Sequence, residues 1–261
     1  MPVADDLILL QEAARAAGDI ALGFFKCDPE AWEKPDSAGP VTEADLAVDR
    51  MLREDLCAAR PDYGWLSEET EDTPDRLSHD KVFVVDPIDG TRAFIEGSPT
   101  WAHSLAIVDR GQVTAAVVYL PVNDSLYAAQ LGGGATLNDA SIHVRETARL
   151  DDASLLAARP VFDAWNWRDG QVPTVKRQFR SSLAYRMSLV GEGRFDAMLT
   201  LRATWEWDVA AGALIVTEAG GRVTNRRLDA LRFNNPGGQV NGVLAASPTI
   251  HNAIGARLSQ A

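Results

Sequence analysis

Cysteine and long apolar runs are scarce in this sequence. Only two cysteines occur, Cys27 and Cys57, and their separation matches no zinc-binding spacing, so we expect neither a disulfide framework nor a cysteine metal site. No run of about 18 apolar residues is present, and the segment Met1 to Asp6 lacks the basic region and apolar core of a secretory signal. We therefore expect a cytoplasmic protein without a membrane partner.

Positive charge is also scarce, because 25 lysine and arginine residues stand against 37 aspartate and glutamate residues, which gives a formal net charge of −12. A nucleic-acid surface needs a basic stripe that displaces counterions, so this balance argues against a nucleic-acid partner. The histidines are far apart in the sequence, and neither a Gly-x-Ser-x-Gly elbow nor a Walker loop occurs. His103 is therefore expected to be packed rather than catalytic.

An apolar run leads directly into two aspartates. Val82–Val85 suits a strand buried on both faces, and we expect Pro87 to end ladder pairing just after Asp86. Asp89 follows in the expected turn. Ligand sites of open α/β sheets lie beyond the carboxyl ends of the strands, so both carboxylates reach a favourable place for binding. Taken alone, the two aspartates fit an acidic turn after a strand better than a binding site, and it is the full run Asp86–Thr91 that favours the binding site.

The spacing of these carboxylates points to a hard divalent cation. Asp86 and Asp89 would repel each other without a cation between them. Their spacing lets one side chain bridge two ions while the other contacts one, and the turn can add the Ile88 carbonyl as a ligand. Oxygen ligands favour Mg²⁺ or Mn²⁺ over Zn²⁺. The backbone N–H groups of Gly90 and Thr91, at the expected start of a helical turn, suit a phosphate.

A second acidic motif begins at Trp207. The small residues that follow allow a helix at about 208–219 to start close to a neighbouring backbone, with Asp208 in its first turn. Taken alone, Asp208 is also compatible with a capping role, because the helix dipole favours a carboxylate there. Trp205 and Trp207 are expected to be packing residues, and Glu206 is expected to be a solvated neighbour.

Three stretches together resemble the signatures of the inositol monophosphatase superfamily, whose members are Mg²⁺-dependent, lithium-sensitive phosphatases. The stretches are Asp86–Thr91, Trp207–Gly212 with the downstream Glu218–Gly221, and Ser67–Glu69. They occur in the family's order, and the resemblance spans nearly the whole chain. It implies an α/β fold, the layered α-β-α-β-α sandwich of inositol monophosphatases and sugar phosphatases, and the hydrolysis of a small phosphorylated metabolite.

The resemblance also implies the ligands of two or three Mg²⁺ ions. Glu68, Asp86 and the Ile88 carbonyl match the ligands of one ion. Asp86, Asp89 and Asp208 match the ligands of a second. Mn²⁺ is compatible with the same oxygen ligands.

Roles in handling water and phosphate are implied in the same way. Glu68 and Thr91 would activate the attacking water, and Asp45 would orient Thr91 through a hydrogen bond. The amides of Gly90 and Thr91 would hold the phosphate, and Lys34 would lie in the loop that covers the metals. Without the resemblance, Asp45 is explained by its place in the first turn of an expected helix.

Hydrophobic periodicity predicts the elements around these motifs. Residues 1–150 are expected to form an α+β section with an antiparallel meander, and 151–261 an α/β section, the two being intimately packed. The expected helices are at 5–25, 42–60, 173–192, 208–219 and 248–259, and the expected strands are at 82–85, 103–108, 113–119, 125–130, 154–158, 195–200 and 241–246.

The residues before the second motif bear on the substrate. Where animal inositol monophosphatases carry an acidic residue that contacts inositol, this chain has Thr200 or Leu201. The ending Thr204-x-Glu-Trp-Asp208 is more similar to bacterial 3′(2′),5′-bisphosphate nucleotidases, so such a nucleotide is the favoured substrate. Thr204 and Trp205 are the candidate substrate contacts, Trp205 by stacking on adenine. Inositol 1-phosphate, histidinol phosphate and fructose 1,6-bisphosphate are the alternatives.

A function of another class is a regulatory binding protein with vestigial catalysis, since some relatives of the family act through partner proteins. The presence of every ligand position of the family's motifs argues against this interpretation. Dimers are common among relatives, so a homodimer is also considered.

Overall fold

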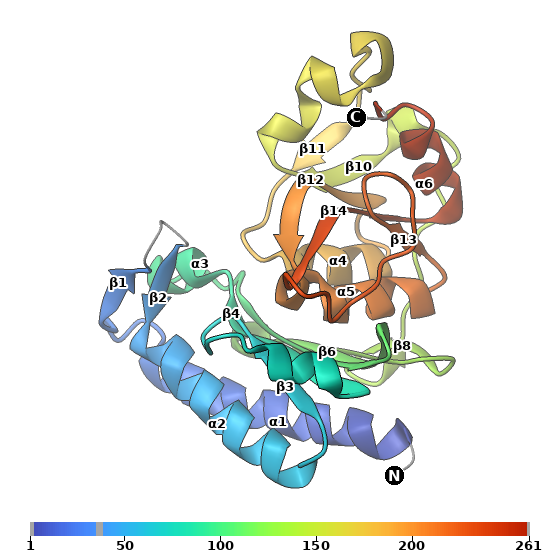
Figure 1. Cartoon of the computed structure of the whole chain (residues 1–261). Helices are drawn as coiled ribbons and strands as arrows, with labels where there is room; N and C mark the ends of the chain where they lie inside the picture. Colours follow the sequence, from blue (N-terminus) through green and yellow to red (C-terminus); the bar gives the residue numbers. More distant parts are fainter. Residues whose placement is uncertain (1–2, 35–38, 260–261) are drawn as a thin grey trace.

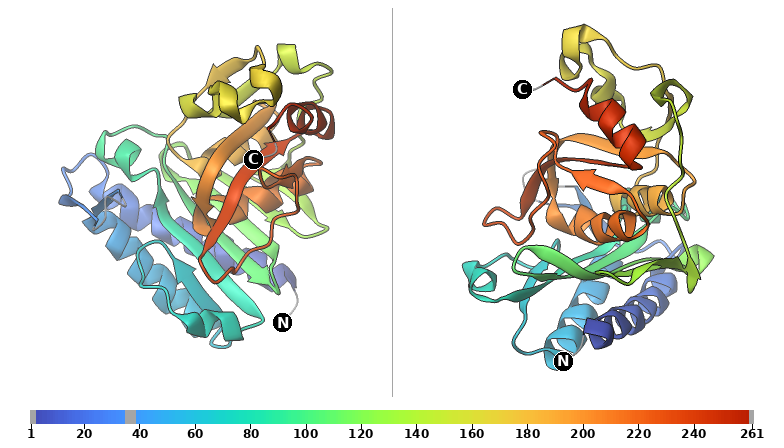
Figure 2. Two further views of the ribbon diagram at one scale, coloured as in Figure 1. Left: turned by 45° about the horizontal axis from the view of Figure 1, so that its top comes forward. Right: turned by 90° about the vertical axis from the view of Figure 1, so that its right-hand side faces the viewer.

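The structure, a computed structural model, describes residues 3–34 and 39–259. The chain folds into layers in the order helix, sheet, helix, sheet, helix (Figures 1 and 2), which confirms the sandwich expected from the sequence. Within these residues no helix is long and apolar enough to cross a membrane. The helical layers are α1 (Val3–Phe24) with α2 (Glu43–Ala59), α4 (Leu183–Gly191) with α5 (Glu206–Glu218), and α6 (Pro248–Gly255).

The described strands form sheets of seven, five and two strands. The seven-stranded sheet follows the chain from β3 to β9, and β3 and β4 are its parallel pair. The five-stranded sheet has the order β11-β10-β12-β14-β13, in which β10, β11 and β12 are parallel. The strands are β1 (Ala31–Glu33), β2 (Pro40–Thr42), β3 (Gly64–Ser67), β4 (Lys81–Asp89), β5 (Ala102–Asp109), β6 (Gln112–Leu120), β7 (Ser125–Gln130), β8 (Gly134–Leu137), β9 (Ala140–Ser141), β10 (Ser154–Ala157), β11 (Lys176–Gln178), β12 (Ala197–Trp205), β13 (Arg222–Thr224) and β14 (Gln239–Ala246).

Strand β4 is buried on both faces, as its continuous apolar run predicted. Val82 and Val84 belong to the core shared with α4 and α5, whereas Phe83 and Val85 belong to the core shared with α1 and α2. The two sets separate because successive side chains of a strand point to opposite faces of the sheet. A third core joins the five-stranded sheet to α6. The seven-stranded and five-stranded sheets are therefore each covered by helices on both sides.

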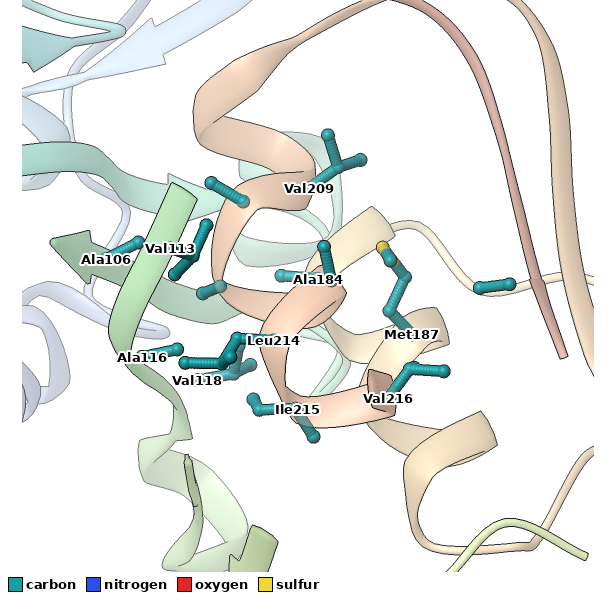
Figure 3. Packing of buried hydrophobic residues seen from close by; sticks show 14 of the residues in the cluster. Ala106, Val113, Ala116, Val118, Ala184, Met187, Val209, Leu214, Ile215 and Val216 are labelled. Atoms are coloured by element: carbon teal, nitrogen blue, oxygen red, sulfur yellow. The ribbon is translucent and has the colours of Figure 1, made fainter. Parts of the chain in front are cut away.

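Helices α4 and α5 form the layer between the two large sheets (Figure 1). Leu214 of α5 packs near Val118 of the seven-stranded sheet (Figure 3), and Val243 of the five-stranded sheet belongs to the same buried cluster. A Cβ atom at Gly212 would lie 2.6 Å from the Cβ of Met187 on α4. The motif glycine therefore permits the close approach of the two central helices.

Pairing along β4 differs from the expectation in one respect. Pro87 does not end the ladder: Asp86 pairs with Ser104, and after a shift in register Asp89 pairs with Ala102. One more residue on β4 than on β5 lies between these pairs, so a bulge accommodates the proline, which has no N–H to donate. Both aspartates consequently belong to the strand itself.

A second difference concerns the helix expected at 173–192. Lys176–Gln178 instead forms the edge strand β11, parallel to β10, and α4 begins only after the N-cap residue Ser182. Pairing with β10 outweighs the helical pattern here, as tertiary contacts often do. The other expected helices and strands are confirmed, apart from their end residues.

The expected boundary near residue 150 falls between β9 and β10, where the chain passes from one sheet to the other. The largest buried cluster nevertheless combines side chains from both sides of this point, such as Val118 and Met198. The division into two sections stays a prediction. The shared core shows that the residues on the two sides of this boundary pack together.

Candidate active site

Three carboxylates predicted as metal ligands converge in the fold. Glu68 directly follows β3, Asp86 lies in β4, and Asp208 lies in the first turn of α5. Each offers one oxygen, and these oxygens lie within 4.8 Å of one another. The parallel pairing of β3 and β4 brings the first two together, and α5 supplies the third from between the sheets.

Asp86 is buried among other carboxylates of the site. Burial raises the pKa of its carboxyl well above the usual value, and the charges of Glu68, Asp89 and Asp208 raise it further. Its Oδ1 atom is buried and accepts no hydrogen bond from the described residues. A buried carboxylate oxygen without a donor is costly unless a cation contacts it. The donor set, oxygen atoms only, fits Mg²⁺ or Mn²⁺.

Asp89 lies beside this cluster rather than among its three mutually close oxygens. Its Oδ2 accepts hydrogen bonds from the Ser182 hydroxyl at 2.7 Å and from the Ala184 N–H at 2.6 Å. Burial raises its pKa to about 6, although these hydrogen bonds act in the opposite direction. Burial raises the pKa of Asp208, and the nearby charge of Asp89 raises it further. Through its hydrogen bonds to Ser182 and Ala184, Asp89 connects this region to the start of α4.

Thr91 and Asp45 make the contact that the resemblance implied. The Thr91 hydroxyl lies 3.3 Å from Asp45 Oδ1 and 3.2 Å from the Ile88 carbonyl. The other oxygen of Asp45 accepts the Thr42 N–H at 2.8 Å, within the capping box that begins α2. Burial raises the pKa of Asp45 to about 6, although the hydrogen bonds from Thr42 act to lower it. Asp45 therefore holds the hydroxyl of Thr91 in a fixed direction.

The turn between β4 and α3 (Thr91–Ile95) requires glycine. Gly90 has φ 101°, in the left-handed region, and precedes the first residue of α3. A Cβ atom there would lie 3.4 Å from the carbonyl oxygen of Thr100. This conformation presents the backbone at Gly90 and Thr91 at the start of a helical turn, the arrangement expected for a phosphate contact.

Lys34 contacts the edge of the cluster. Its Nζ lies 2.7 Å from Glu68 Oε1 and 2.7 Å from Glu69 Oε1. Burial and the nearby charge of Glu68 together raise the pKa of Glu69 to about 7, although Lys34 acts in the opposite direction. The loop expected to cover the metals includes positions 35–38, which lie outside the described residues. The Lys34 ammonium itself balances two carboxylates here.

His103 is fully buried, as expected of a packed side chain. Burial lowers its pKa to about 4, so the ring is neutral near pH 7, and its Nδ1 contacts the Pro87 carbonyl. His103 thus supports the bulge of β4 and takes no part in the carboxylate cluster.

Glu206 is a correction to the sequence interpretation. It was expected to be solvated, but its side chain is fully buried. It accepts hydrogen bonds from the Asn234 N–H at 2.6 Å, the Asn235 N–H at 2.8 Å and the Asn235 Nδ2 at 2.7 Å. The sequence signal was weak: an Asn-Asn-Pro-Gly-Gly turn far along the chain from an isolated glutamate. Glu206 secures this turn beside the start of α5.

Arg76 was missed altogether by sequence reasoning. This buried side chain pairs with Asp72, with Nε 2.6 Å from Oδ1, and its Nη2 donates to the Asn235 carbonyl at 2.9 Å. It therefore joins the segment that follows Glu68 to the turn held by Glu206. Buried arginines have no distinctive sequence pattern, since burial depends on the partners that the fold supplies.

A cleft of about 600 Å³ opens at the cluster and has Asp89 and Asp208 in its wall. Thr200 and Leu201, which replace the acidic position of animal inositol monophosphatases, line it as well. Its wall combines arginines and aspartates with apolar side chains. The other lining residues are Arg92, Ala158, Pro160, Val161, Asp163, Trp165, Asn166, Phe179, Ser181, Leu183, Arg186, Leu199 and Arg202.

The two predicted substrate contacts do not line this cleft. Thr204 is 1% exposed, and its hydroxyl donates to the Arg202 carbonyl at 3.0 Å. Trp205 stacks on Trp207 with ring centroids 4.6 Å apart, and 43% of its surface is exposed. The structure thus buries Thr204 and leaves Trp205 accessible outside the cleft.

Comparison with known proteins accounts for this arrangement. The family model described as "Inositol monophosphatase family" matches residues 4–261. An inositol-1-monophosphatase of Rhizobium meliloti is 34% identical, with 84% of each chain covered, and a Nus factor SuhB of Xylella fastidiosa is 29% identical, with 94% of this chain and 91% of that protein covered. The solved structure of an IMPase from Thermotoga maritima superposes with a TM-score of 0.83 at 28% identity, covering 97% of this chain and 96% of that one. With the carboxylate cluster in the same fold, the chain belongs to the inositol monophosphatase family of phosphatases.

Proposed function

We propose that this protein hydrolyses a small phosphomonoester with Mg²⁺ bound at Glu68, Asp86 and Asp208, with Asp89 and the Ile88 carbonyl as further ligands. The buried Asp86 Oδ1, which accepts no hydrogen bond within the described residues, supports this most directly. When bound, the ions supply Lewis acidity and lower the pKa of water.

The protein's own groups then orient the reactants. Asp45 accepts the hydrogen bond of the Thr91 hydroxyl, which leaves an oxygen lone pair of Thr91 free to accept a hydrogen bond from the attacking water. Half-buried Glu68 takes the proton of that water. The amides of Gly90 and Thr91 donate to the phosphate oxygens, which need neutralising contacts more than a covalent nucleophile.

The favoured substrate is a 3′(2′),5′-bisphosphate nucleotide. Such a molecule carries a second phosphate, and the cleft beside the carboxylates is lined by Arg92, Arg186 and Arg202. The lining residues Thr200 and Leu201 offer no carboxylate for the hydroxyl groups of inositol. Inositol 1-phosphate is the second candidate, because a relative that is 34% identical is named inositol-1-monophosphatase.

A phosphate-release panel tests the proposal. Adenosine 3′,5′-bisphosphate, inositol 1-phosphate, histidinol phosphate and fructose 1,6-bisphosphate are compared with Mg²⁺, with Mn²⁺, with a chelator, and with Mg²⁺ plus Li⁺. We expect metal-dependent, Li⁺-inhibited release that is fastest from the nucleotide. Asp86→Asn should abolish release while the circular dichroism spectrum stays that of the wild type.

Release from none of the substrates would overturn the proposal. That outcome would favour a regulatory role through a partner protein, as the name of the Xylella fastidiosa relative, Nus factor SuhB, suggests for that protein. Release from inositol 1-phosphate alone would keep the reaction and replace the substrate.

A further inference from the structure

Two aromatic side chains in the cleft wall are unusually exposed. Trp165 is 73% exposed and Phe179 is 48% exposed, although both line the cavity that reaches Asp89 and Asp208. Single exposed apolar residues are common and need no explanation. Two aromatic rings in one cavity with candidate metal ligands are a different case, since ligand pockets combine aromatic walls with a few placed polar groups.

Trp165 is held in place by its neighbours. It lies in a short 3₁₀ turn, Ala164–Asn166. The Asn166 Nδ2 donates to the Pro160 carbonyl at 2.9 Å, and the Trp167 Nε1 donates to the Val161 carbonyl at 2.9 Å. Trp167 is buried in the core beneath α6. These contacts anchor Asn166 and Trp167, the two residues that follow Trp165. The exposed ring of Trp165 is therefore attached to a fixed backbone segment.

Cationic groups lie between this aromatic wall and the carboxylates. The guanidinium of Arg186 stacks 4.2 Å from the ring centroid of Phe179 and is fixed by donation from its Nε to the Arg180 carbonyl. Its electrostatic neighbours include Asp89, Arg202 and Asp208. The side chain of Arg202 is exposed and makes no hydrogen bond or ion pair with any residue in 3–34 or 39–259.

We propose that Trp165 stacks on the base of a nucleotide substrate while Arg202, supported by Arg186, binds the phosphate that is not cleaved. This inference rests on the proposed function, because the other phosphate must reach the carboxylate cluster. An inositol ring has neither an aromatic face for Trp165 nor a second phosphate for Arg202. Loss of base stacking on one aromatic side chain weakens binding roughly 5- to 100-fold, a change large enough to measure in KM.

The base is tested with Trp165→Ala and Trp165→Phe, and Leu131→Ala is the control for loss of an exposed apolar side chain outside the cleft. With adenosine 3′,5′-bisphosphate, Trp165→Ala should raise KM roughly tenfold and change kcat less than about twofold, and Trp165→Phe should restore most of the loss. Nucleotide binding should quench tryptophan fluorescence in the wild type, and Trp165→Phe should remove most of this quenching. Leu131→Ala should match the wild type in both measurements.

The second phosphate is tested with Arg202→Ala, and Arg227→Ala is the control because Arg227 is exposed and does not line the cleft. Arg202→Ala should lower kcat/KM for adenosine 3′,5′-bisphosphate roughly tenfold, the scale of one charge-assisted contact. It should leave kcat/KM for adenosine 3′-monophosphate unchanged, because this substrate lacks the second phosphate.

The outcomes separate this inference from the function on which it rests. If the wild type cleaves the bisphosphate nucleotide but Trp165→Ala keeps its KM and its fluorescence response, Trp165 is not the stacking residue and the proposed function stands. If Arg202→Ala lowers activity equally with both nucleotides, the phosphate assignment is overturned. If the wild type cleaves only inositol 1-phosphate, the nucleotide substrate fails and this inference fails with it.

Discussion

Two regions at the cleft, here called the carboxylate end and the aromatic end, are built from different kinds of structure. The carboxylate end is the cluster of Glu68, Asp86 and Asp208, which the cleft reaches at Asp208. These residues lie in or directly beside buried elements, where sheet pairing and the packing of α5 hold one oxygen of each within 4.8 Å of the others. The aromatic end takes Trp165 and Phe179 from irregular segments at the surface, where their rings are half-exposed or more. Core packing fixes the carboxylate end, whereas irregular connecting segments at the surface form the aromatic end.

From this difference we expect the carboxylate end to carry out the reaction and the aromatic end to select the substrate. A carboxylate cluster locked into the core can stay constant while the connections at the far end of the cleft vary, because changes at the surface cost little stability. Substitutions at the first end should therefore affect all substrates alike. Substitutions at the second should change the ranking of substrates.

The largest expected effect tests the carboxylate end. Asp208→Asn should lower kcat/KM by at least roughly 100- to 1,000-fold for every phosphomonoester that the wild type cleaves, the scale for loss of one charge-stabilising group. The measurement is phosphate release with Mg²⁺, with the nucleotide and inositol 1-phosphate compared in parallel. A loss confined to one substrate would place Asp208 in recognition instead.

Glu206→Gln provides the matched comparison two residues away. An amide nitrogen would replace one of the oxygens that accept N–H groups of Asn234 and Asn235, and the charge would be lost. We expect the free energy of unfolding in urea to fall by about 2–3 kcal/mol. The ratio of kcat/KM between two substrates should stay within about twofold of wild type, since Glu206 faces the turn and not the cleft. Wild-type stability would contradict the structural role.

Asp196 tests stability away from both ends. Burial would raise the pKa of this carboxyl, but hydrogen bonds from Arg145, Ser154 and Thr147 lower it to about 2 from an ordinary 3.8. A depressed pKa stabilises the folded state above the ordinary pKa, and this contribution is lost as the pH falls toward 2. Asp196→Asn should therefore cost about 2 kcal/mol at pH 7 and progressively less below pH 4. Urea unfolding over this range measures the difference, and a constant difference would refute it.

Gly212→Ala gives the smallest expected change. The new Cβ would meet Met187, so α4 and α5 would have to separate slightly, at about 1–2 kcal/mol. Gly23→Ala in α1 is the control, because a Cβ there meets nothing within 4 Å. Thermal unfolding of both variants checks the prediction. Equal melting temperatures would show that the central helices tolerate the methyl group.

The carboxylate end could be predicted from sequence because its residues lie in short motifs. Asp86 lies in its own strand and Asp208 in the first turn of its own helix, so the motifs located both residues, whereas their grouping as metal ligands was implied by the family resemblance. The pairing of β4 was expected to end at Pro87. It continues to Asp89 because a bulge accommodates the proline, and such a bulge depends on the partner strand. The layered fold followed from the family resemblance and was confirmed.

The remaining features depend on contacts across long distances in the sequence. Glu206 is buried by a turn that begins 28 residues later, so its solvated interpretation was wrong. Thr204 points into the protein, while Trp165 and Phe179 gave no local signal and reach the cleft only through the fold. The helix expected at 173–192 begins only at Leu183, because Lys176–Gln178 pairs with β10 as the edge strand β11. Side-chain placement in irregular segments is decided by tertiary packing.

The position of α5 between the two sheets has a consequence for folding. Asp86 belongs to one sheet, whereas Asp208 is carried by a helix whose core neighbours come from both. Neither sheet assembled alone contains the complete oxygen set. If the proposed metal site is correct, its capacity to bind an ion should arise late, when the layers dock. Time-resolved metal uptake during refolding would then report the final assembly step rather than the formation of either sheet.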